Sequence, residues 1–386
     1  MLKNEYVLSE DFFNRVDNEF SKLETPIKKL IVVEHAVENS LSFLKYLCLN
    51  YDVYFIAKPK SKNMFVLHEL SKICTVLNVG RNDLQNKNKA SDILKNIVHN
   101  DSFAIIDIGG YFAKNYKDIE HTFNKQLIKI IEDTENGYQK YEHVLFNSKN
   151  NNIPILSVAR SPLKIEEDYL VGHEIVIKSE LFLAGRGTTL LGKNALVIGF
   201  GKIGHSICES LRSRGVNVSV CDKNYIRQAM ALAHGFNYVD NIYEKLKNID
   251  LLFIANGEQS IDTNKLKFID LKNTVFCFSV TSADDTYKNS LYLGKLKQYG
   301  TKVPFKIVKA QSNKFIIANN GNAINFTFTS PTLSEYVQLT QAEMMIMLKK
   351  KINMLDNHIA ELDFSSRNKI AYLWLNYIQE RCDSNA

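Results

Sequence analysis

Short apolar runs alternate with segments of helical period through the first half of the chain. Apolar residues recur at helical spacing within residues 1–30, at Phe12, Phe13, Val16, Phe20 and Leu23, which predicts a helix. Further helices are predicted from the first strand to about residue 46, over 119–133, and over about 161–184. Strands are predicted at 30–34, 53–57, 102–110 and 152–158. Strands that alternate with helices predict a parallel sheet covered by helices on both faces.

A second series of the same kind follows the glycine-punctuated stretch 185–193. Buried strands are predicted at 195–198 and 218–220, and three later apolar runs lie within 249–257, 273–280 and 314–321. Beyond Gly321 the pattern predicts a long helix, with Ser330 and Thr332 as candidate caps. We therefore expect an α/β fold with two domains, each a doubly wound parallel sheet.

Length and composition agree with this organisation. The 386 residues exceed what one hydrophobic core usually supports, which favours two domains. The net charge of +6 comes from basic and acidic residues spread along the chain, without the dense basic patch of a nucleic-acid-binding protein. The six cysteines form no CxxC pair, which suits a reducing compartment. With no signal-peptide pattern and no run of about 20 apolar residues, we expect a cytoplasmic protein without a membrane partner.

A glycine motif lies between the second series' first strand and first helix. Gly199, Gly201 and Gly204 fit G-x-G-x-x-G, with Lys202 and Ile203 inside the turn. Such a turn lets the backbone approach a pyrophosphate at a helix N-terminus. Asp222 lies 23 residues after the first glycine, at the end of the next strand, where a carboxylate binds the ribose hydroxyls of NAD. The sequence therefore predicts a Rossmann-type domain that binds NAD, and Lys223 and Arg227 leave NADP as the alternative.

The motif sets the expected domain limits. Residues 1–175 form the first part of a discontinuous substrate domain, 176–324 the NAD domain, 325–360 the return to the substrate domain, and 361–386 a C-terminal helix or tail. In such folds, ligands bind at the carboxyl ends of the strands, so we expect an active site in the cleft.

Several segments together resemble the S-adenosylhomocysteine hydrolase (adenosylhomocysteinase) family, over most of residues 28–345. The most specific is IPILSVARSPLKIEEDYLVG at 153–172, which aligns Lys164 and Asp168 with the family's ribose-binding lysine and aspartate. EDTENG at 132–137 resembles the family's acidic turn, which implies a substrate contact for Asp133 and a cofactor contact for Thr134. VVEHAVENS implies a substrate contact for His35. Further candidates are Asn39, Asp107 and Asn322 for substrate, and Asn256 and Asn320 for cofactor.

The chain departs from this family at positions that carry its acid/base chemistry. Ile108 stands where the family has the second aspartate of an acidic pair, and Thr281 and Asn322 stand at two of its histidines. Tyr169 replaces the asparagine after the ribose-binding aspartate. Residues 360–386 show no counterpart of the family's C-terminal tail, which reaches a neighbouring subunit. The resemblance thus implies a divergent member of the family.

The family's reaction begins when bound NAD oxidises a ribose hydroxyl, which requires a base and groups that orient the diol. Lys164 is the candidate base, with Asp168, His35 and Asp133 as further catalytic candidates; alternatively, Lys164 is a surface lysine paired with Asp168, and Asp133 caps a turn. His173, His205 and His234 are interpreted as structural or exposed, and no metal is expected.

The leading hypothesis is an NAD-dependent enzyme that oxidises a secondary hydroxyl of a nucleoside-like or polyol-type substrate, with the elimination apparatus altered. Three alternatives remain: an active S-adenosylhomocysteine hydrolase of one-carbon metabolism, a silent NAD-binding regulatory partner, and a 2-hydroxyacid dehydrogenase-like oxidoreductase. A small-molecule substrate and a homo-oligomer, dimer or tetramer, are expected.

Overall fold

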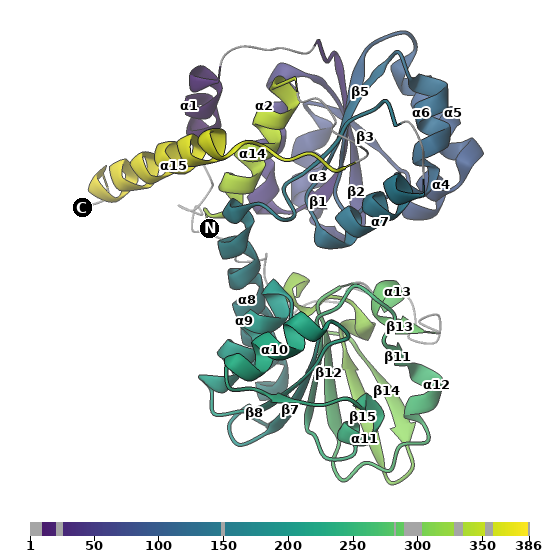
Figure 1. Cartoon of the computed structure of the whole chain (residues 1–386), viewed down its shortest axis with the longest axis vertical. Coiled ribbons are helices and arrows are strands. Elements are labelled where there is room, and N and C mark those ends of the chain that lie inside the picture. The colour runs from purple at the N-terminus through teal and green to yellow at the C-terminus, as the bar shows by residue number, and fades with distance from the viewer. Residues whose placement is uncertain are drawn as a thin grey trace. The chain divides into compact units, whose positions relative to one another are not determined.

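The computed structural model describes residues 10–20, 26–147, 151–281, 283–288, 303–327, 335–351 and 358–384. The chain divides into two compact units. The first comprises Met1–Ile165 and Leu333–Ala386, and the second comprises Glu166–Thr332. Figure 1 labels their elements. Within the described ranges, no helix has the length and apolarity needed to cross a membrane.

The first unit contains a six-stranded parallel sheet of order β3-β2-β1-β4-β5-β6. Its strands are β1 (Lys29–Ala36), β2 (Asp52–Lys62), β3 (Thr75–Leu77), β4 (Phe103–Asp107), β5 (Leu127–Glu132) and β6 (Ile155–Ser157). Its helices are α1 (Asp11–Glu19), α2 (Glu38–Asn50), α3 (Met64–Ser71), α4 (Arg81–Gln85), α5 (Lys87–Val98), α6 (Tyr116–Phe123), α7 (Glu135–Phe146), α14 (Val337–Lys349) and α15 (Phe364–Ser384), with short 3₁₀ helices η1 (Ala113–Asn115) and η2 (Pro162–Lys164).

Both faces of this sheet are covered, as the alternation along β1 shows. Leu30 and Val32 belong to a core shared with α1, α2, α14 and α15, whereas Ile31 and Val33 belong to a second core shared with α5, α6 and α7. Successive residues of a strand point to opposite faces, so two separate cores identify a doubly wound sheet.

The second unit contains a seven-stranded sheet of order β14-β15-β12-β10-β7-β8-β9, parallel except for the β14–β15 pair. Its strands are β7 (Asn194–Ile198), β8 (Asn217–Cys221), β9 (Asn237–Tyr238), β10 (Leu251–Ile254), β12 (Val275–Ser279), β14 (Phe305–Ala310) and β15 (Asn313–Ala318), and a separate small sheet pairs β11 (Ile261–Asp262) with β13 (Tyr287–Lys288). Its helices are α8 (Ile165–Ala184), α9 (Lys202–Arg212), α10 (Tyr225–Ala233), α11 (Ile242–Leu246), α12 (Thr263–Leu266) and α13 (Ala283–Thr286), with 3₁₀ helices η4 (Asn319–Gly321) and η5 (Ile324–Phe326).

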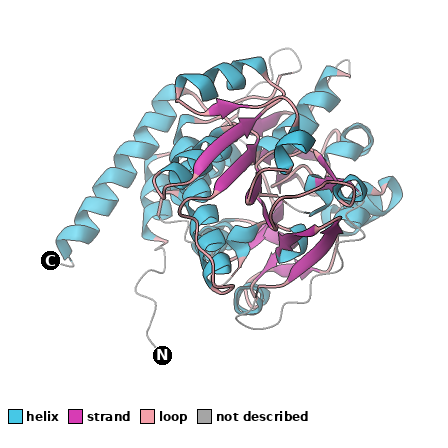
Figure 2. Ribbon diagram, turned by 90° about the horizontal axis from the view of Figure 1, so that it is seen from below, coloured by secondary structure: helices cyan, strands magenta, loops and turns pink. Residues whose placement is uncertain are grey.

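The expected α/β class with parallel sheets is confirmed. The first boundary falls at residue 165 rather than 175, because Ile175, Val176 and Phe182 of α8 pack into the core of the second unit. The stretch 361–386, expected as a C-terminal helix or tail, contains the helix α15, whose residues Ile370 and Trp374 are buried in the first unit's core. The helix α15, with the C-terminus near its end, is easily followed in Figure 2.

One element prediction was wrong, and an edge strand was missed. The helix expected over 119–133 is α6 followed by the buried strand β5, because a short apolar run such as LIKII does not distinguish a strand from a helix by periodicity. The edge strand β14 was missed because its apolar residues are interrupted by Lys306 and Lys309, so that FKIVKA contains no continuous apolar run. The proposed caps Ser330 and Thr332, and Leu23 of the first helix, lie outside the described residues.

Candidate active site

Ionisable side chains gather at the carboxyl edge of the first unit's sheet. Glu34 and His35 lie near the end of β1, Lys58 lies on the neighbouring strand β2, Asp133 directly follows β5, and Lys164 ends η2 after β6. Parallel strands bring their carboxyl ends to one edge, so residues far apart in sequence meet there. We call these five residues the charged cluster.

Lys164 and Asp133 form the best-defined contact of the charged cluster. The Nζ atom of Lys164 donates to Oδ1 of Asp133 at 2.8 Å and to Oδ2 at 2.9 Å. Both side chains are largely buried, with 7% and 14% of their surfaces exposed. The alternative of a surface lysine is therefore wrong: the amine is held at a defined place inside the fold.

Burial perturbs the remaining members of the charged cluster. It raises the pKa of Glu34 to about 8, helped by the nearby negative charge of Asp133. It lowers the pKa of His35 well below its usual value, and the positive charges of Lys58 and Lys164 act in the same direction. The ring Nδ1 of His35 is hydrogen-bonded to the Ser61 hydroxyl. Burial also lowers the pKa of the Lys58 amine. The Glu34 carboxyl thus exchanges a proton closer to neutral pH than a free carboxyl does, whereas the His35 ring is held in its neutral form.

Asp107 and Glu132 are also at this edge, but they hold the backbone. The fully buried carboxylate of Asp107 accepts from the Tyr111 amide at 2.9 Å, from the Phe112 amide at 2.8 Å and from the Tyr141 hydroxyl at 2.6 Å. This geometry favours a structural role for Asp107 over the expected substrate contact.

Glu132 ties two loops together. Its carboxylate accepts from the amides of Gly109, Gly110, Asp133 and Thr134, at distances between 2.7 and 3.1 Å. A Cβ atom at Gly137 would lie 2.1 Å from this carboxylate, so only glycine fits there. These contacts fix the backbone around Asp133.

Two further candidates of the first unit lie at helix starts. Thr134 is the N-cap of α7: its hydroxyl accepts from the Gly137 amide at 3.1 Å and donates to Glu132 at 2.8 Å. Asn39 lies in the first turn of α2 and is half-buried. The capping role of Thr134 is visible, whereas its cofactor contact stays a prediction.

The substituted family positions carry no acid/base pair in the described structure. Ile108 is 2% exposed and belongs to the first unit's apolar core. In the second unit, the Thr281 hydroxyl pairs with the Thr286 hydroxyl at 2.9 Å, and the Asn322 amide side chain donates to the Asn319 carbonyl at 3.2 Å. An apolar side chain at position 108 can neither give nor take a proton.

The glycine turn of the second unit has the geometry that its motif predicts. Gly199 has φ of +97°, and a Cβ there would lie 2.7 Å from the Ala255 carbonyl oxygen. A Cβ at Gly204 would lie 2.0 Å from the Gly199 carbonyl oxygen. At Gly201 the nearest neighbour of a Cβ would be the Arg227 guanidinium, 3.5 Å away. The turn leads into α9 at Lys202 and Ile203, so the amides of the helix N-terminus are available to a pyrophosphate.

Asp222 lies at the end of β8, beside the turn. Its Oδ2 accepts from the Phe200 amide at 2.7 Å, its Oδ1 accepts from the Asn224 amide at 2.8 Å, and Arg227 approaches Oδ2 at 3.8 Å. Each carboxylate oxygen can accept more than one hydrogen bond, so this position fits the ribose-binding carboxylate of an NAD site.

The other second-unit candidates border the same sheet edge. Asp168 on α8 approaches Lys202 of the turn, with 3.4 Å between Oδ2 and Nζ, and it belongs to a different unit from Lys164. Asn256 follows β10 and accepts from the Ser260 hydroxyl at 3.3 Å. Asn320 follows β15 with φ of +50°. Their cofactor and substrate contacts stay predictions.

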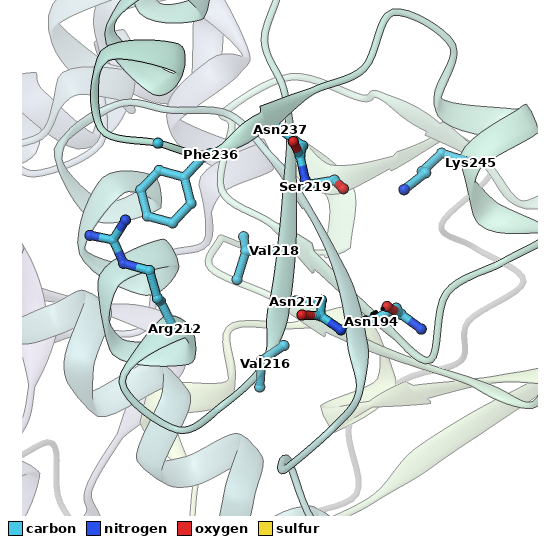
Figure 3. A pocket seen from close by; sticks show the side chains of 10 residues that line it. Asn194, Arg212, Val216, Asn217, Val218, Ser219, Phe236, Asn237 and Lys245 are labelled. Carbon is cyan, nitrogen blue, oxygen red and sulfur yellow. Dashed lines mark hydrogen bonds between the residues drawn. The ribbon is translucent and has the colours of Figure 1, made fainter.

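A pocket of about 310 Å³ lies elsewhere in the second unit (Figure 3). It includes Asn194 and Asn217, the first residues of β7 and β8, whereas the glycine turn follows the last residue of β7. The pocket is therefore at the opposite strand ends from the NAD motif, and we assign it no part in the chemistry.

Sequence reasoning missed Glu34, Lys58 and Glu132. Glu34 and Lys58 lie within or directly after the apolar stretch of a predicted strand, in VVE and VYFIAK, whereas Glu132 ends LIKIIE, an apolar run that was predicted as part of a helix. That placement was the available signal, because the carboxyl ends of parallel strands carry binding sites.

Comparisons with known proteins bear on the second unit. Residues 183–329 match the family model described as the S-adenosyl-L-homocysteine hydrolase, NAD binding domain. Among solved structures, the chain is similar to a phosphoglycerate oxidoreductase from Vibrio cholerae, with 14% identity over 69% of this chain and 79% of that one and a TM-score of 0.42. A putative D-isomer specific 2-hydroxyacid dehydrogenase from Polaromonas matches at 11% identity, over 93% and 98% of the chains, with a TM-score of 0.44.

The chain is also similar to a dipicolinate synthase from Bacillus halodurans, with 11% identity over 84% and 98% of the chains and a TM-score of 0.41. With sequence identities and TM-scores this low, these similarities identify neither a substrate nor a reaction for this chain. The family match and the geometry of the glycine turn agree. Residues 183–329 form an NAD-binding domain, and NAD is its cofactor.

Proposed function

We propose that this protein is an NAD-dependent oxidoreductase that acts on a secondary hydroxyl of a nucleoside-like or polyol-type substrate, as a divergent relative of S-adenosylhomocysteine hydrolase. The observation that carries the proposal is the buried Lys164–Asp133 pair, held among Glu34, His35 and Lys58 in a chain that also has an NAD domain. Buried and mutually perturbed groups at a sheet edge are typical of acid/base sites.

Lys164 moves the proton in this proposal. After its ammonium has released a proton to solvent, the neutral amine takes the proton of the substrate hydroxyl, and Asp133 positions the amine through two hydrogen bonds and stabilises the ammonium that forms again. When bound, NAD supplies a hydride acceptor for the carbinol carbon. Glu132 acts through the backbone, because it fixes the amides of Asp133 and Thr134 and thereby the position of the Asp133 carboxylate.

The same geometry supports the expectation that elimination is slow in this protein. Cleavage of a carbon–sulfur bond after the oxidation requires a further acid/base pair, and Ile108 cannot supply one. We therefore expect S-adenosylhomocysteine hydrolysis well below the typical enzyme rate of about 10 s⁻¹.

One observation favours an active hydrolase as the second candidate. Glu34 has a pKa raised to about 8, so its carboxyl can exchange a proton near neutral pH and could stand in for the lost acid/base group. Release of homocysteine thiol from S-adenosylhomocysteine by the NAD-loaded protein, abolished by Glu34→Gln, would support this candidate.

The test of the leading proposal is a substrate screen with the NAD-loaded protein. Nucleosides, thioether nucleosides and polyols are added in turn, and absorbance of reduced nicotinamide is followed. We expect reduction with at least one ribonucleoside or polyol and little thiol release. If NAD binds but no compound of the panel reduces it, this result would contradict the proposal of an oxidoreductase and favour the regulatory alternative.

A further inference from the structure

We propose that His205, Glu209 and His234 form a binding site for a zinc-class divalent transition-metal ion in the second unit. The site is independent of the function proposed above. It lies on α9 and at the end of α10, and nothing in the charged cluster contributes to it.

The local sequence brings the first two ligands together. His205 and Glu209 are four residues apart on α9, so their side chains lie on one face of the helix. His234 is the C-cap of α10, which follows the neighbouring strand β8. No local motif contains all three residues, which explains why no metal was expected from the sequence.

The distances between the ligand atoms suit a metal. Oε1 of Glu209 lies 3.5 Å from Nε2 of His205 and 3.8 Å from Nδ1 of His234. One ligand atom from each residue lies within 4.8 Å of the others. Around a tetrahedral zinc with bonds of about 2.1 Å, neighbouring ligand atoms are about 3.4 Å apart. Small side-chain rotations would therefore close the site around an ion.

A second observation points to a missing partner. Nε2 of His205 is closed to solvent although its side chain is 30% exposed, and among the described residues it completes no hydrogen bond, since Oε1 of Glu209 approaches it only as an ion-pair contact at 3.5 Å. Buried polar atoms of native proteins are nearly always satisfied, so this nitrogen requires an explanation. The rings of His205 and His234 lie 4.2 Å apart between centroids, which leaves the nitrogen next to a second imidazole and a carboxylate.

The surroundings orient these ligands. Arg212 contacts Oε2 of Glu209 and donates to the His234 carbonyl at 2.7 Å, so Oε1 is the carboxylate oxygen that faces the imidazoles. The ring centroids of Phe200 and His205 lie 4.9 Å apart. Partners that hold ligands in this way typically strengthen metal sites.

The ligand set indicates the class of ion. Two imidazoles and one carboxylate suit zinc, cobalt, nickel and copper, whereas calcium and magnesium prefer oxygen ligands. Three protein ligands leave a fourth position to water. A bound ion would join the first turn of α9, directly after Gly204, to the end of α10, and so stabilise the second unit by mass action.

The test measures binding of Zn²⁺ and Co²⁺ to the full chain. The starting protein carries no purification tag and is stripped of metal before the titration. We expect one equivalent of Zn²⁺ by calorimetry, a Co²⁺ absorption spectrum without the charge-transfer band of a thiolate, and a higher Tm in excess zinc. His205→Ala, His234→Ala and Glu209→Gln should each weaken binding by about tenfold or more, the scale of disturbing a metal site.

His173→Ala is the matched control, because the Nε2 atom of His173 is also buried without a hydrogen-bond partner in the described structure, but His173 is not one of the three ligands. It should bind zinc as the natural chain does. NAD affinity, measured for every variant, reports whether the second unit is folded. No bound zinc in the natural chain, or equal affinity in NAD-binding variants of the three ligands, would overturn the proposal.

Discussion

The charged cluster of the first unit and the glycine turn of the second are built in opposite ways. The turn lies within six consecutive residues, Gly199–Gly204, and its geometry follows from close backbone contacts. The cluster draws on β1, β2, β5 and η2, and its members meet only because their strands share a sheet edge. A local site can be recognised from spacing, whereas a site assembled by topology shows its members only after folding.

The largest effect is expected from filling the glycine turn. In Gly204→Ala, the new methyl group would lie 2.0 Å from the Gly199 carbonyl oxygen, so the turn must shift. NAD affinity should fall by about 100-fold or more, equivalent to about 3 kcal/mol. Gly185→Ala is the control, because its Cβ would make only ordinary contacts at 3.6 and 3.8 Å. Calorimetry with NAD checks both; natural affinity in Gly204→Ala would contradict the close approach.

The next effect concerns the charged cluster. Lys164→Met keeps much of the apolar stem but removes the amine bound to Asp133. Single-turnover reduction of bound NAD by an active substrate should slow by about 100-fold or more, the usual scale for a positioned proton acceptor. NAD affinity should not change.

Lys29→Met is its control, since Lys29 is buried at the amino end of β1 and donates to the Ile97 carbonyl. An equal loss of hydride transfer in both variants would indicate a general structural effect rather than a role for Lys164.

A smaller effect is expected at the cofactor's carboxylate. Asp222→Ala removes the group placed to bind the ribose hydroxyls, and it also frees the Phe200 and Asn224 amides. NAD affinity should fall by about tenfold, and the preference over NADP should narrow because the repulsion of a phosphate is lost. Titrations with both cofactors measure this. Equal affinity of the natural chain for NAD and NADP would show that Asp222 does not select the cofactor.

The smallest effect is a pH dependence of stability. The pKa of Glu34 is raised from 4.5 to about 8 in the folded chain, so folding favours its protonated form. That contribution is fully present below about pH 4.5 and is lost as the pH rises through about 8. Relative to Glu34→Gln, the free energy of unfolding should therefore fall over this interval by at least about 1 kcal/mol, a lower bound that counts only one pKa unit of the shift at about 1.4 kcal/mol.

Urea unfolding followed by Trp374 fluorescence measures it, because this sole tryptophan lies in the first unit's core. Parallel pH profiles for the two proteins would contradict a raised pKa of Glu34.

The sequence predicted strands and helices well where the periodic pattern extended over many residues or where proline or glycine marked the end of an element. Pro162 at the start of η2 and the glycine turn before α9 are examples. It failed at β5, where a short Ile-rich run suits either kind of element, and at β14, an edge strand whose apolar residues are interrupted by two lysines. Neither failure involves the position of the glycine turn.

Prediction of the candidate site was more uneven. Lys164 and Asp133, chosen through a family resemblance, meet in the structure, 31 residues apart in sequence. Asp107 was chosen on the same ground; its carboxylate accepts three hydrogen bonds from the surrounding fold, and its substrate contact stays a prediction. Glu34 and Lys58 were missed, because their burial beside other charges depends on the pairing of β1 with β2 and β4.

We propose above all that the chain transfers a hydride from a secondary carbinol carbon to NAD. The most direct measurement uses NAD-loaded protein and a ribonucleoside or polyol, active in the screen, that is deuterated at one secondary carbinol carbon at a time. We expect deuterium in the reduced nicotinamide, found by mass spectrometry, for one labelled carbon, and its near absence with Lys164→Met. Reduction without transfer of the label from any secondary carbon would contradict this hydride transfer.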